Sequence, residues 1–91
     1  MYSAKATIIN KTGLHARPAS EFVKEAKKFT SKIKIANLST PEEEPVNAKS
    51  IVSILSLGMT QNTPVELSAD GEDEKEAVDA LTALIRSGFG E

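Results

Sequence analysis

Residues 65–86, with the sequence VELSADGEDEKEAVDALTALIR, decide the fold, because the spacing of their apolar side chains changes partway along. Over residues 65–69 apolar and polar residues alternate, which predicts a strand with one buried face. The segment that follows carries apolar residues at helical spacing, in a stripe of Ala77, Val78, Leu81, Leu84 and Ile85. We expect this helix to start at Asp73, as the N-cap of a capping-box pair with Glu76, and to end at Arg86 and Gly88.

Two further segments, residues 3–9 and residues 32–35, have the alternation that is typical of strands. We expect residues 46–47 to form a short edge strand opposite residues 32–35. The segment Ser39–Pro45 contains two prolines and three glutamates, so we interpret it as a loop.

Two further segments have helical spacing. One covers residues 16–29, and the other runs to Leu57, with Ser50 as its N-cap and Gly58 as its stop. The second of these is apolar on most sides, so we expect it to press hard on the core. The order β-α-β-β-α-β-α predicts an α+β fold, a two-layer sandwich in which helices cover one face of a four-stranded, largely antiparallel sheet.

Composition limits the kind of protein. Ninety-one residues suffice for one modest core, so we interpret residues 1–91 as a single domain. The chain has no cysteine, which excludes disulfides and thiolate metal sites. No apolar run reaches the roughly 18–20 residues of a membrane span. Residues 1–5 do not resemble a secretory signal, so we expect a cytoplasmic protein.

The net charge of -2 is distributed unevenly. Residues 1–49 contain nine Lys or Arg and five Asp or Glu, whereas residues 50–91 contain two and eight. These are either two solvated faces of opposite sign, or a basic rim around the single histidine that attracts an acidic partner. The basic patch is modest and aromatic residues are few, which argues against nucleic-acid binding.

The only histidine lies in Gly13-Leu14-His15-Ala16-Arg17-Pro18-Ala19, where a helix is expected to begin. Neutral imidazole is a usable nucleophile near physiological pH. The first N–H groups of a helix make no bond within it, so we expect those of Ala16 and Arg17 to meet an anion. The Arg17 guanidinium is a planar donor suited to phosphate oxygens. Together these groups predict a histidine that carries a phosphoryl group.

Other roles for His15 fit less well. It could simply bond a backbone N–H as a helix cap, since a lone histidine is often structural. A zinc site needs three or four ligands, and the chain has no second histidine. The chain contains the residue types of a Ser-His-Asp triad, but it lacks the Gly-x-Ser-x-Gly elbow that presents the serine in such hydrolases. It also lacks a Walker loop, which argues against binding ATP by that motif. No cofactor is implied, and the phosphoryl group is expected to come from a partner.

Ser50 is a second candidate for phosphate. Most N-cap serines only cap, but the same position tolerates an added phosphate because the helix dipole favours negative charge there. Beside it, Ile51 and Leu55 are either core residues or an exposed docking patch.

Several stretches resemble a known family. Residues Gly13–Ala19 are similar to the active-site motif of HPr, the histidine-containing phosphocarrier family of the bacterial sugar phosphotransferase system, and Asn47–Ile51 to its regulatory-serine motif. Ser56–Gly58 and Ser68–Glu74 continue the likeness, in order, over nearly the whole chain. The resemblance implies an open-faced sandwich of four strands and three helices.

The resemblance also implies a route for the phosphoryl group. Nδ1 of His15 would accept it from enzyme I, which takes it from phosphoenolpyruvate, and would pass it to IIA domains of sugar permeases. Arg17 would contact the phosphate or an acidic group of a partner. The first two helices would form the docking surface, to which we assign Lys49, Ile51 and Leu55. We expect a monomer that is not itself an enzyme.

In Gram-positive relatives the serine matching Ser50 is phosphorylated by HPr kinase/phosphorylase, and the product acts with a catabolite control transcription factor. This sequence differs from many of those relatives at two places. Val52 replaces a methionine, and the loop Ser39–Pro45 is longer and more acidic. The alternatives are a regulatory or nitrogen-branch paralogue of the same fold, and a plain interaction module.

Overall fold

The computed structural model describes residues 1–90, which contain four strands, three helices and a final 3-10 turn. The strands are β1 (Tyr2–Thr7), β2 (Lys32–Asn37), β3 (Val46–Asn47) and β4 (Pro64–Asp70). The helices are α1 (Ala16–Ala26), α2 (Ile51–Ser56) and α3 (Glu74–Arg86), and the turn η1 covers Gly88–Gly90. The order agrees with the prediction from hydrophobic spacing. None of the helices in residues 1–90 is long and apolar enough to cross a membrane.

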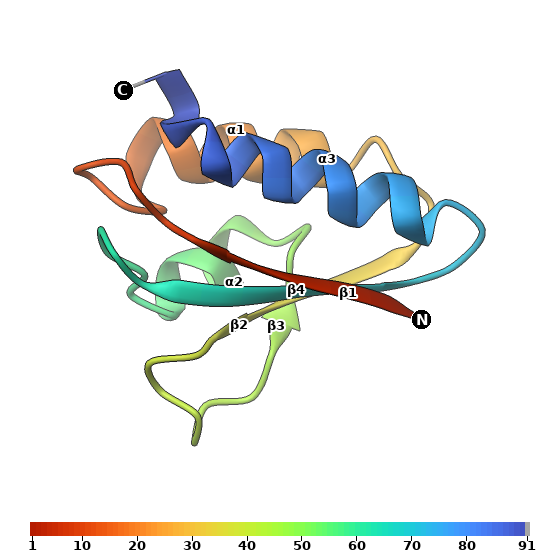
Figure 1. The fold of residues 1–91 in the computed structure, drawn as a ribbon, viewed down its shortest axis with the longest axis horizontal. Coiled ribbons are helices and arrows are strands. Elements are labelled where there is room, and N and C mark those ends of the chain that lie inside the picture. The colour runs from red at the N-terminus through yellow and green to blue at the C-terminus, as the bar shows by residue number, and fades with distance from the viewer. Residues whose placement is uncertain (91) are drawn as a thin grey trace.

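The strands form one antiparallel sheet in the order β1-β4-β2-β3. Helices α1 and α3 lie side by side over one face of this sheet (Figure 1). The short helix α2 contacts α1 and the edge strand β3. The predicted edge strand is confirmed, because Ile35 pairs with Val46 and Lys34 with Asn47. The α+β open-faced sandwich is therefore confirmed.

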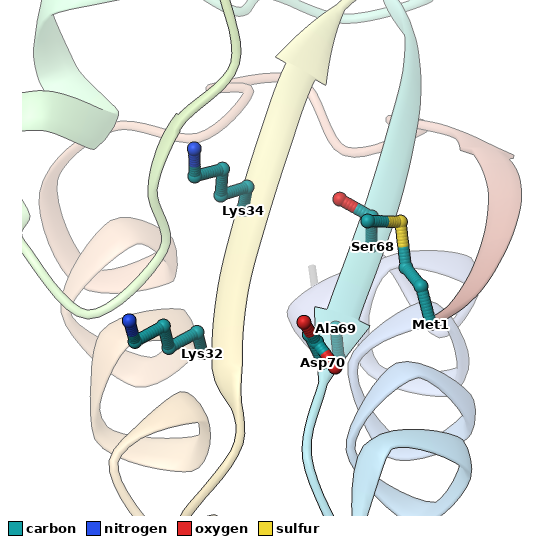
Figure 2. A pocket seen from close by; sticks show the side chains of 6 residues that line it. All are labelled: Met1, Lys32, Lys34, Ser68, Ala69 and Asp70. Carbon is teal, nitrogen blue, oxygen red and sulfur yellow. The ribbon is translucent and has the colours of Figure 1, made fainter.

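The two faces of the sheet differ as the alternation predicts. Ile35, Val65 and Leu67 point toward the helices and are fully buried. On the other face, Lys32 lies across from Asp70. A hollow of about 200 Å³ at that end of the sheet is lined by Met1, Lys32, Lys34, Ser68, Ala69 and Asp70 (Figure 2). It is smaller than the roughly 300–1,000 Å³ of typical small-molecule sites, so it offers no conventional ligand pocket.

Two predicted elements are longer than the real ones. Helix α1 ends at Ala26, with Lys27 as its C-cap, so Phe29 lies beyond the helix. Phe29 still packs against the core. Its position in the sequence therefore continued the helical spacing of apolar residues, although the helix has already ended. Strand β1 ends at Thr7, although Ile8 continues the alternation and is fully buried.

The expectation that α2 presses hard on the core is wrong. Ile54 is fully buried, but Ile51 is 39% exposed, Leu55 41% and Val52 73%. The helix is only six residues long and lies beside the edge strand, so one of its sides meets the core and the others face solvent. Three apolar side chains are therefore presented at the surface.

The capping box predicted at the start of α3 is also wrong. Asp73 is the N-cap residue, but its side chain makes no capping bond. Its carboxylate instead accepts hydrogen bonds from the backbone N–H of Thr30, at 2.8 Å, and of Ser31, at 3.0 Å, and from the Ser31 hydroxyl. These bonds fasten the start of α3 to the start of β2. The hydrogen bonds from the Ser31 hydroxyl and the Thr30 N–H lower the pKa of Asp73 from 3.8 to about 2.

We expect Asp73→Asn to lower the free energy of unfolding at neutral pH by an amount that disappears in acid. Because the folded-state pKa lies below the ordinary value, the carboxylate contributes stability that is complete above about pH 4 and is lost as the pH falls toward 2. Denaturant titrations across this interval measure the effect. The gap between wild type and variant should close as the pH falls, and a gap of constant size would contradict the assignment.

Candidate functional site

The loop between β1 and α1 is fixed by the loop that follows α2. The backbone N–H of Leu14 donates to the Met59 carbonyl at 3.0 Å, and the Leu14 side chain is buried. Gly13 has a φ of +69°, and a Cβ at this position would lie 2.4 Å from the same Met59 carbonyl oxygen. The Asn10 side-chain amide donates to the Gly13 carbonyl at 2.8 Å. The residue before His15 is therefore held rigidly.

His15 is exposed at the start of α1. It is the N-cap residue, with extended backbone, and its side chain makes no capping hydrogen bond. The alternative of a histidine that caps the helix is therefore wrong. No acidic side chain lies in the first turn of α1, so the positive end of the helix dipole is not neutralised locally.

Ala16 begins α1 with strained backbone. Its φ is +54°, in the left-handed region that costs a non-glycine residue roughly 1–2 kcal/mol. Strain of this kind concentrates at functional sites and persists only where neighbouring structure imposes it. Here the fixed loop ends at Leu14, and the helix proper continues from Arg17, so Ala16 absorbs the change of direction.

The acceptors of the Arg17 guanidinium include a carboxylate and a backbone carbonyl. Nη1 donates to Oε1 of Glu21 at 2.5 Å, and Nη2 donates to the Phe89 carbonyl oxygen at 3.2 Å. Phe89 itself is buried, so its carbonyl is held in place beside α1. The side chain that the sequence assigns to phosphate is thus engaged by the helix and by the C-terminal turn η1.

Ser50 is the N-cap of α2, as predicted. Its hydroxyl oxygen accepts a hydrogen bond from the Ser53 backbone N–H at 3.3 Å. The neighbouring Lys49 donates from Nζ to the Phe29 carbonyl at 2.6 Å, which ties it to the segment after α1. Ile51 and Leu55, the other two residues assigned to docking, are exposed.

A groove of about 360 Å³ runs between α1 and α2, lined by Ser20, Val23, Lys24, Lys27 and Ile51. It combines the apolar side chains of Val23 and Ile51 with two lysines, one in α1 and one at its C-cap. No group of three His, Cys, Asp or Glu side chains that could hold a metal ion occurs within residues 1–90.

Three residues at or near the site were not predicted from the sequence. Glu21 could have been found from its spacing, because residues four apart share a helix face. Met59 and Phe89 are distant in sequence, and no local pattern indicates that they contact the segment around His15.

The family model for the PTS HPr component phosphorylation site matches residues 2–87. Phosphocarrier protein HPr of Haemophilus influenzae is 48% identical, over 93% of this chain and 95% of that protein. The HPr-like protein Crh of Bacillus subtilis is 43% identical, over 94% of this chain and 96% of that protein. A multiphosphoryl transfer protein of Haemophilus influenzae is 51% identical over 93% of this chain, but the match spans only 17% of its length.

Solved structures agree with these relatives. HPr-C-His from Thermoanaerobacter tengcongensis is 52% identical and superposes with a TM-score of 0.92, covering 100% of this chain and 98% of that one. An HPr dimer from the same organism is also 52% identical, with a TM-score of 0.76 and complete coverage of both chains. Since relatives occur as dimers, the monomeric state expected from the sequence stays a prediction.

Proposed function

The chain belongs to the HPr family of phosphocarrier proteins, whose members are carriers and not catalytic enzymes, and we propose that it carries phosphoryl groups on His15. One observation supports this most directly. The only histidine is exposed at the start of α1, and its side chain is not used as a helix cap. An imidazole in that position is accessible to partner proteins on both steps of a transfer.

The chemistry requires only the imidazole and a place for the phosphate. The lone pair of Nδ1 attacks phosphorus, an N–P bond forms, and the bond from phosphorus to the donor atom breaks with its electron pair. Nε2 keeps its proton, so the phosphorylated ring is positively charged and remains a good leaving group for the next acceptor. The backbone N–H groups of Ala16 and Arg17, together with the Arg17 guanidinium, stabilise the phosphate oxygens.

We propose that enzyme I supplies the group from phosphoenolpyruvate and that IIA domains of sugar permeases receive it, in the cytoplasm. The support is the surface along α1, where the groove between α1 and α2 carries Lys24 and Lys27 together with the exposed Ile51. Leu55, on the same helix as Ile51, is also exposed. An apolar centre with a basic rim suits an acidic partner surface. Chemical-shift mapping with enzyme I checks whether these residues and Lys49 are covered.

Phosphorylation of wild type tests the proposal. Enzyme I and radiolabelled phosphoenolpyruvate should place one acid-labile phosphate on each chain, as expected for a phosphohistidine. An acid-stable label, or none, would exclude His15 as the acceptor. A plain interaction module, the alternative from another class of protein, would take no label.

We also propose that Ser50 is a regulatory phosphorylation site and that a catabolite control transcription factor binds the phosphorylated form. HPr kinase/phosphorylase with ATP should add an acid-stable phosphate that Ser50→Ala loses and Ser53→Ala keeps. A dianion at the start of α2 would repel an acidic enzyme I surface and slow labelling of His15. An unchanged rate of His15 labelling after Ser50 phosphorylation would contradict the regulatory role.

A second candidate function is a regulatory or nitrogen-branch paralogue. The 43% identity to Crh, an HPr-like protein, supports this second candidate. The retained His15 argues against a purely regulatory chain, since such a chain does not need the nucleophile. Labelling by enzyme I distinguishes the carrier from a purely regulatory chain, because only the carrier should be labelled on His15.

A further inference from the structure

Glu21 and the turn η1 both hold the Arg17 guanidinium in the structure. The guanidinium bonds Glu21 Oε1 through Nη1 and the Phe89 carbonyl through Nη2. Glu21 is four residues after Arg17, toward the C-terminus of α1, whereas His15 is at the N-terminal end of the same helix. The ion pair therefore draws the guanidinium along the helix in the direction opposite to the acceptor nitrogen.

The Phe89 carbonyl and the Glu21 carboxylate differ in how they would respond to an incoming phosphate. The Phe89 carbonyl is neutral and is fixed by the burial of its own side chain, so it can share the guanidinium with a phosphate. Glu21 carries a full negative charge and accepts a hydrogen bond from the Arg17 guanidinium, the same group that would donate to a phosphate. A phosphorylated His15 and Glu21 therefore compete for Arg17.

We propose that Glu21 is a positioning residue that holds Arg17 away from His15 and so limits how strongly the phosphorylated state is stabilised. This inference rests on the proposed phosphocarrier function. A carrier has to release its phosphoryl group, and an arginine that is already paired binds phosphate less tightly than one that is not. The exposed pair is weak, so the effect is a tuning of the transfer equilibrium and not an on-off switch.

Glu21→Gln tests the proposal, because it keeps the size of the side chain and removes its charge. We expect the equilibrium of phosphoryl transfer from enzyme I to shift about two-fold toward the phosphorylated chain, the change that an exposed i,i+4 ion pair supports. The hydrolysis half-life of the isolated phosphorylated chain should lengthen in the same direction.

Glu25→Gln is the matched control. Glu25 lies one turn further along α1 and pairs with Lys28 at 3.0 Å, so its replacement makes the same change of charge without touching Arg17. It should leave both readouts unchanged. The effect of Glu21→Gln should also vanish in an Arg17→Gln background, which a merely structural role of Glu21 would not predict.

The possible results are distinct. If wild type is labelled on His15 and Glu21→Gln behaves like wild type, or like Glu25→Gln, the role of Glu21 is overturned while the carrier function stands. If wild type takes no label on His15, the carrier function fails, and the role of Glu21 fails with it.

Discussion

Replacing His15 with alanine is expected to reduce phosphoryl acceptance from enzyme I below detection while the fold survives. The side chain is the only imidazole in the sequence, so no other residue can form a phosphohistidine. It is exposed and makes no capping bond, so its removal should change the free energy of unfolding by less than about 0.5 kcal/mol. Labelling with radioactive phosphoenolpyruvate and a denaturant titration measure the two quantities.

His15→Gln is a useful companion variant. It keeps a polar side chain of similar reach but lacks a nucleophilic ring nitrogen, so it should lose labelling as completely as the alanine variant does. Undiminished labelling of either variant would remove His15 from the mechanism. Loss of labelling together with unfolding would instead show that the histidine holds the structure, which the exposed position does not predict.

Gly13→Ala is expected to destabilise the protein strongly and to slow transfer through His15. The new methyl group would lie 2.4 Å from the Met59 carbonyl oxygen and 2.7 Å from Cα of Thr60, and both are backbone atoms. Left-handed strain and this overlap together should cost about 2–4 kcal/mol. Displacement of the loop would also move His15, so the rate of labelling should fall by more than the unfolded fraction explains.

Gly58→Ala is the matched control for this prediction. Gly58 has a φ of +59°, close to that of Gly13, but nothing lies within 4 Å of a Cβ built there. The variant should therefore lose only the free energy of placing a non-glycine residue in the left-handed region, about 1 kcal/mol, and His15 should be labelled as in wild type. If the two variants were equally stable, the contact between the Gly13 and Met59 loops would not be what fixes the site.

The parts of the fold that could be predicted are those set by local periodicity. In β4 and α3 the change from alternation to a helical stripe leaves only one way to bury the apolar side chains, and the structure has both elements where the sequence indicates them. Helix α2 was misjudged for a physical reason. Counting apolar residues shows that a segment prefers burial, but not how much of its surface the neighbouring elements are able to cover.

The candidate site divides in the same way. The motif around His15, the N-cap at Ser50 and the spacing of Arg17 are local features, and the structure places them where the sequence predicted. The contacts of Gly13 with Met59 and of Arg17 with Phe89 join segments far apart in the chain, as do the bonds of Asp73 to the start of β2. Such contacts depend on how the loops meet, which no short window of sequence contains.

The contact between the His15 loop and Met59 has a consequence for when in the life of the molecule phosphate can be received. A chain still emerging from the ribosome presents the histidine long before residue 59, and longer still before the turn that holds Arg17. The surroundings of His15 are thus complete only after the segments around residues 59 and 89 have been synthesised and folded. Under the proposed carrier function, incompletely folded copies are expected to accept fewer phosphoryl groups than folded ones.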